Sequence, residues 1–177
     1  MISEKRPGLF PREIALYALL GALCYSLKMA MSWLPNIEPV SFLVILYALV
    51  LGRRALYPIY VYVALEILTF GIHYWSVCYL YIWVILYGLT RCLRSRRDPL
   101  SWAILCGAYG LCFGLLCTPV YWLSGGWQFA LSWWLSGIPY DLLHGAGNFF
   151  ITLLLFPPCY RWLQRLFKAY FESFPHL

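Results

Sequence analysis

Long apolar runs separated by short polar connectors make up most of this chain. A helix needs about 20 mainly apolar residues to cross the hydrocarbon core of a bilayer. The pattern therefore predicts six transmembrane helices, over about residues 13–33, 39–51, 55–72, 75–92, 101–123 and 137–163. The second run is shorter than this length, so we expect it to be tilted, shielded by its neighbours or partly re-entrant.

The composition places the chain in the membrane class. Of its 177 residues, 63% are hydrophobic and 11% are charged, and the mean hydropathy is +0.71. A soluble domain of this size has too little interior to hide so much apolar surface. The seven cysteines include no Cys-x-x-Cys pair, so we expect small apolar helix residues rather than a metal or redox site. The expectation is an all-α membrane protein with one integral membrane domain over residues 1–177.

The basic residues that produce the net charge of +6 follow the predicted topology. All but one of the 13 Lys and Arg residues precede the first run, follow the sixth, or separate the second from the third and the fourth from the fifth. With six spans, these four segments fall on one side of the membrane, and the opposite connectors hold no Lys or Arg. This positive-inside pattern predicts a multi-pass membrane protein with both termini cytoplasmic. It also accounts for the basic residues without a nucleic-acid partner.

Two charged side chains interrupt the apolar runs. Lys28 lies late in the first run and Glu66 lies in the third. A charge within the bilayer is costly and normally has a partner or a function. Lys28 either reaches the outer headgroups or lines a ligand site, and Glu66 either lines a pocket or pairs with Lys28. Asn36 and Glu38, in a proline-bounded outer connector, form a solvated turn or join the same pocket.

The sixth run carries a polar stripe. Asp141, His144, Asn148 and Thr152 are three or four residues apart and share one helix face. Because such a face avoids lipid, it makes hydrogen bonds to another helix or, in our preferred interpretation, lines a substrate cavity.

Aromatic side chains surround the outer connectors, where they can stack on a flat ring. The connector at residues 124–136 carries tryptophans that form an interfacial belt or a lid over an outward-facing site. With the polar residues, these aromatics complete the candidate substrate site. The predicted substrate-binding residues are Lys28, Asn36, Glu38, Glu66, Tyr74, Trp75, Trp133, Asp141, His144 and Asn148.

Small residues form a second kind of pattern. Ala18, Ala22 and Ser26 recur every four residues in the first run, and the fifth run contains Gly110-Leu-Cys-Phe-Gly114. Small residues at this spacing allow close helix packing in membranes. The partner is either another helix of this chain or another membrane subunit.

The chain resembles the substrate-binding S component of an energy-coupling factor (ECF) vitamin transporter over nearly its whole length. The segment Leu34-Pro-Asn-Ile-Glu-Pro-Val40, continuing to Gly52, is similar to the region of helices one and two in that family. The segment Gly137-Ile-Pro-Tyr-Asp-Leu-Leu-His144, followed by Asn148, is similar to its sixth helix.

The resemblance implies a mechanism and partners. An S component captures a vitamin or related micronutrient outside the prokaryotic plasma membrane and associates with a transmembrane T component and two ATPases. Ala18, Ala22 and Ser26 match the face that docks the T component. The chain has no phosphate-binding loop of the GxxxxGK[ST] type. We therefore expect a transport subunit rather than an enzyme, with no catalytic or metal-binding residues and with ATP and Mg²⁺ on the partner ATPases.

The predicted site favours a cationic or amine-bearing heteroaromatic ligand, because carboxylates outnumber the single amine. Queuine-like and thiamine-like compounds fit this description, while riboflavin and cobalamin stay open and an anionic folate fits less well. The alternatives are a membrane assembly or structural protein without a ligand, a stand-alone carrier and a membrane-embedded metal enzyme. Ligands for such a metal are His73, Asp141, His144 and Glu66, but the chain has no His-Glu-x-x-His motif.

Overall fold

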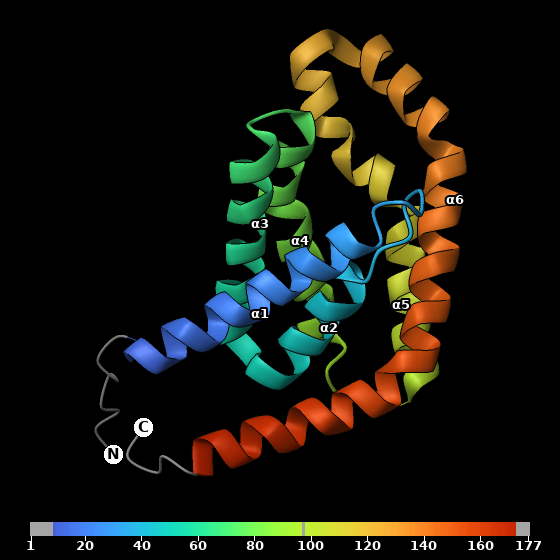
Figure 1. Ribbon diagram of the computed structural model, residues 1–177. Coiled ribbons are helices and arrows are strands. Elements are labelled where there is room, and N and C mark those ends of the chain that lie inside the picture. Colours follow the sequence, from blue (N-terminus) through green and yellow to red (C-terminus); the bar gives the residue numbers. More distant parts are fainter. Residues whose placement is uncertain (1–8, 97, 173–177) are drawn as a thin grey trace, which may run out of the picture.

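The computed structural model describes residues 9–96 and 98–172, and this part of the chain is helical without a β-strand. Figure 1 shows the arrangement of its helices. The elements in chain order are α1 (Pro11–Ala30), α2 (Val40–Leu51), the 3₁₀-helix η1 (Gly52–Ala55), α3 (Leu56–Phe70), α4 (Tyr74–Cys92), α5 (Pro99–Leu111) and α6 (Phe113–Glu172).

Four helical stretches in the described residues are long and apolar enough to cross a membrane. Two of the shorter helices, α2 and α3, reach this length only when they are counted as one stretch through η1. The class of protein is therefore confirmed as all-helical with membrane-type helices, while the division into six spans stays a prediction. The stretches are Pro11–Ala30, Val40–Phe70, Tyr74–Cys92 and Pro99–Tyr170.

The short α2 helix lies inside the bundle. Every residue from Val40 to Ala48 is buried, and the helix packs against α1, α4, α5 and α6. All side chains of this helix except Ser41 and Tyr47 are purely apolar, so burial on every side is favourable. Of the three explanations for its short length, shielding by neighbouring helices is the one that the structure supports.

The region around residues 101–136 differs from the sequence prediction. The predicted fifth helix is interrupted at Cys112, which ends α5 just before α6 begins. The predicted connector at 124–136 is helical except at Gly126, where φ is 80° and the backbone leaves the helix. Leu, Ala, Trp and Phe side chains in this connector are compatible with a helix, and only a glycine adopts such a φ without strain.

The C-terminal part of α6 also differs from the prediction, which ended the sixth helix near residue 163. The helix continues to Glu172 and contains Pro157 and Pro158. Figure 1 shows α6 turning sharply where its colour passes from orange to red, so that its last part runs across the end of the bundle. Proline removes a helical hydrogen bond and bends the helix, which explains a turn in this region.

Figure 1 also shows where the basic segments lie. The start of α1, the η1 turn, the segment between α4 and α5 and the last part of α6 are all at the lower end of the bundle. The turn between α3 and α4 lies at the upper end, and so does the part of α6 that contains the break at Gly126. An ion pair between the buried Glu13 and the partly exposed Arg54 joins the start of α1 to η1 at the lower end.

Candidate functional site

Two cavities that share lining residues form the candidate site. The first has a volume of about 310 Å³ and the second about 300 Å³, and Asn36 and Trp75 line both. The first is also lined by Lys28, Glu38, Glu66, Phe70, His73, Tyr79, Phe113 and His144. The second is also lined by Gly114, Trp133, Ser136, Gly137, Tyr140 and Asp141.

Two charged side chains that line the first cavity, Lys28 and Glu66, form an ion pair. The Lys28 Nζ atom lies 2.6 Å from Glu66 Oε2 and 3.4 Å from the Tyr79 hydroxyl, and it is 5.2 Å from the centroid of the Tyr79 ring. One of the two roles expected for Glu66 from the sequence was a pair with Lys28, and this pair is present. The pair is electrically neutral, but it lies in the cavity wall, and the buried Glu66 Oε1 atom has no hydrogen-bond partner among the described residues.

The connector between α1 and α2 contributes a second carboxylate. Glu38 is partly buried in the first cavity, and burial raises the pKa of its carboxyl group to about 7, against the opposing effect of Lys28. Asn36 adopts a left-handed conformation with φ 54°, which asparagine tolerates better than most residues. This local turn places both side chains in the cavity wall.

Asp141 combines a structural contact with a place in the second cavity. Its two carboxylate oxygens accept the Gly114 backbone N–H at 3.1 and 3.2 Å. Gly114 lies in the first turn of α6, where backbone N–H groups have no partner within the helix. A Cβ atom at position 114 would lie 2.5 Å from Asp141 Oδ2, so a glycine is required for this approach.

His144 and Asn148 continue the polar stripe into the protein. Their exposed fractions are 2% and 1%. Neither His144 Nε2 nor the Asn148 amide atoms have a hydrogen-bond partner among the described residues. His144 lines the first cavity and stacks on Phe113 with ring centroids 4.8 Å apart, while Asn148 lines neither cavity. Buried polar groups without partners are costly, and of these two residues only His144 is placed to contact a molecule in a cavity.

Trp75 lines both cavities and packs against other aromatic rings. Its ring lies 6.2 Å from Phe113 in a stacked arrangement and 5.8 Å from Trp133 edge to face, measured between centroids. Trp133 in turn stacks on Tyr121. Tyr74 lines neither cavity and packs beside Tyr121.

The structure thus brings most of the sequence-predicted residues together around the two cavities. Eight of them line a cavity, whereas Tyr74 and Asn148 do not. The lining residues absent from the predicted set include Phe70, Phe113, Ser136 and Tyr140. Phenylalanines within apolar runs carry no signal that separates a cavity wall from the core, although Tyr140 adjoins the predicted Asp141.

The candidate metal ligands do not form a metal site. Within residues 9–96 and 98–172, no group of three or more His, Cys, Asp or Glu side chains is arranged to hold a metal ion.

The small-residue face of α1 is unused by the described chain. Ala18 and Ser26 are exposed and Ala22 is partly exposed. The opposite side of α1 packs on α3, where a Cβ atom at Gly21 would lie 2.6 Å from Val61. In contrast, Gly110 packs closely on α6 within the chain, since a Cβ atom there would lie 2.7 Å from His144.

The fold and the site together define a helical protein with membrane-type helices and a polar, aromatic-walled cavity pair between them. Comparisons of this chain with protein-family models, with curated proteins and with solved structures find no match.

Proposed function

We propose that this chain is the substrate-capturing membrane subunit of an ECF-type importer. The observation that carries the proposal is the pair of cavities, which gathers charged, amide and aromatic side chains from distant parts of the chain. Buried polar groups in apolar surroundings are expensive, and they are normally kept for binding or transport. The turn between α3 and α4, which borders the first cavity, lies at the end of the bundle opposite the basic segments. The positive-inside rule assigns that end to the outside.

The charges and rings of the site favour a cationic or amine-bearing heteroaromatic ligand. Lys28 is already neutralised by Glu66, so Glu38 and Asp141 are the carboxylates that remain to pair with a positive group. Trp75 and Trp133 offer aromatic faces between the cavities. Two adjoining volumes of about 300 Å³ each suit a ligand with two ring systems or a ring and a polar arm. Thiamine-like and queuine-like micronutrients have this chemistry.

The exposed small-residue face of α1 supplies a surface for the proposed T component. Ala18, Ala22 and Ser26 let a partner helix approach closely, as small residues do in membrane helix pairs. Two ATPases would act through that component, with ATP and Mg²⁺ bound on them. This chain would contribute ligand capture and the docking surface.

Native mass spectrometry of the detergent-purified chain, with denaturing analysis of released compounds, tests the proposal. We expect one small heteroaromatic molecule per chain. Protein that lost its ligand during purification is tested with a panel of compounds, by adding thiamine, queuine, riboflavin or cobalamin and measuring the change in its thermal stability. Trp75→Leu should abolish the stabilisation, whereas Trp122→Leu should retain it, because Trp122 is exposed and lines neither cavity.

A protein that carries no ligand and gains no stability from any compound of the panel would contradict the proposal. That result would favour an assembly or structural protein, for which changes at Glu66 and Asp141 should affect folding alone. Metal analysis of the same sample tests the metal-enzyme alternative.

A further inference from the structure

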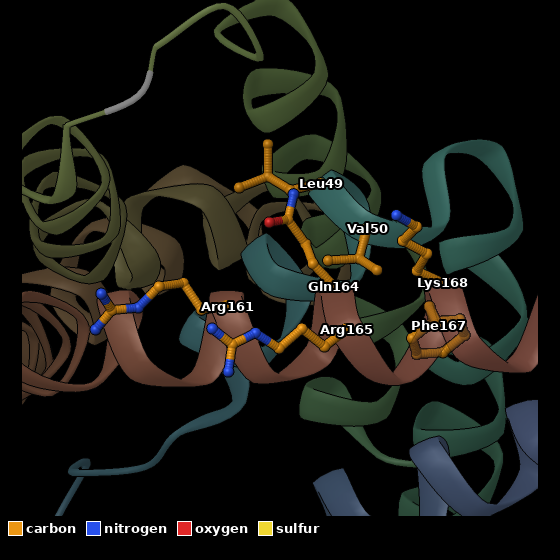
Figure 2. Close-up of a pocket in the computed structure, with 7 residues that line it drawn as sticks. All are labelled: Leu49, Val50, Arg161, Gln164, Arg165, Phe167 and Lys168. Carbon is orange, nitrogen blue, oxygen red and sulfur yellow. The ribbon is translucent and has the colours of Figure 1, made fainter.

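A third cavity lies at the lower end of the molecule and shares no lining residue with the two cavities of the candidate site. Its volume is about 580 Å³, and it lies between the end of α2 and the last part of α6. Figure 2 shows Gln164 and Lys168 reaching from α6 toward Leu49 and Val50 at the end of α2, while Arg161 and Arg165 extend side by side along α6. The lining residues are Leu49, Val50, Arg161, Gln164, Arg165, Phe167 and Lys168.

The last part of α6 has the pattern of a helix that lies along a membrane surface. Arg161, Arg165 and Lys168 are spaced four and three residues apart, so they share one face. Phe167 faces the bundle and is 4% exposed, whereas Trp162 is 63% exposed beside the basic face. Basic residues next to exposed aromatic and aliphatic side chains are typical of helices at the boundary between headgroups and acyl chains.

The chemistry of this cavity, which we name the basic groove, matches a phosphate attached to an apolar group. Among the residues that line it, the charged ones are all cations. A guanidinium group binds phosphate through two parallel hydrogen bonds. Leu49, Val50 and Phe167 supply an apolar wall that a small soluble anion would not use.

We propose that the basic groove binds the headgroup phosphate of an anionic phospholipid of the inner leaflet. Arg161 and Arg165 hold the phosphate, and the first part of an acyl chain lies on the wall formed by Leu49 and Val50. The Arg161 Nε atom donates a hydrogen bond to the Pro157 carbonyl at 3.1 Å, which holds this guanidinium near the bend of α6. Basic pockets between helices on the cytoplasmic side are known to favour anionic headgroups. The proposal rests on the membrane orientation stated above, but not on the identity of the vitamin-like ligand.

Native mass spectrometry of the full chain titrated with single lipids tests the proposal. The probes are phosphatidylglycerol, phosphatidylcholine and inorganic phosphate. We expect the wild-type chain to bind one phosphatidylglycerol more tightly than phosphatidylcholine. The double variant Arg161→Gln/Arg165→Gln should weaken phosphatidylglycerol binding by about 30-fold, since two basic residues near an anionic surface are lost.

The double variant Arg94→Gln/Arg96→Gln is the matched control, because it removes the same charge from exposed positions of the α4–α5 segment outside the groove. It should keep the preference for phosphatidylglycerol. Equal losses in the two double variants, or equal binding of the two lipids by the wild type, would overturn the proposal. Inorganic phosphate that competes with phosphatidylglycerol at similar concentration would also overturn it, in favour of a soluble anion. Binding of the vitamin panel, measured on the same variants, reports on the other site separately.

Discussion

The ion pair between Lys28 and Glu66 allows a test that separates a structural from a ligand-binding role. The side chains of Lys28 and Glu66 are 20% and 7% exposed, and their charged atoms are 2.6 Å apart. Lys28→Met leaves an unpaired carboxylate that is almost fully buried. Removing one partner of a buried pair usually costs ~3 kcal/mol or more of unfolding free energy. Glu66→Gln should cost less, about 1 kcal/mol, because the Lys28 amine that it leaves unpaired is more exposed than the Glu66 carboxylate.

The double variant Lys28→Met/Glu66→Gln completes the cycle. With both charges removed, we expect a loss that is smaller than the sum of the single losses by about 2 kcal/mol. The assay is reversible denaturation in mixed micelles, with Arg94→Met as a control at an exposed position. Ligand titration on the same variants measures the contribution to binding. Single losses that simply add would refute the structural role of the pair, and both charges would then be explained by the ligand alone.

Three further predictions concern the site and the docking face. The pKa of Glu38 is raised to about 7, and a cationic ligand favours its ionised form. The affinity for that ligand, measured by calorimetry, should therefore fall by up to about tenfold per pH unit below 7. Glu38→Gln should remove this component of the pH dependence. Gly114→Ala places a Cβ atom against the Asp141 carboxylate and should lower the unfolding free energy by about 1–3 kcal/mol, measured by denaturation, whereas unchanged stability would contradict the close contact. Ala22→Trp should abolish assembly with a co-expressed T component in pull-down experiments while leaving ligand binding intact, and retained assembly would exclude this docking face.

The candidate site shows how far side-chain chemistry can be predicted from spacing. The stripe of Asp141, His144 and Asn148 follows from helix periodicity, and all three residues are buried. Periodicity does not say what a helix face contacts. Asp141 both lines a cavity and accepts a hydrogen bond from the Gly114 N–H. This N–H is available because the helix is interrupted at Cys112, between α5 and α6, so the first turn of α6 has no partners within the helix. That interruption has no proline or polar signal in the sequence.

The membrane character and the separation of basic segments were determined by the chain's one-dimensional pattern. Apolar length and the positions of Lys and Arg are local properties, and the energetics of the bilayer act on them directly. Which distant side chains meet was decided only by the tertiary structure. The Lys28–Glu66 pair joins residues 38 positions apart, and the burial of α2 depends on the helices around it. Such contacts are chosen by packing among many distant side chains, and neither composition nor periodicity encodes which of them meet.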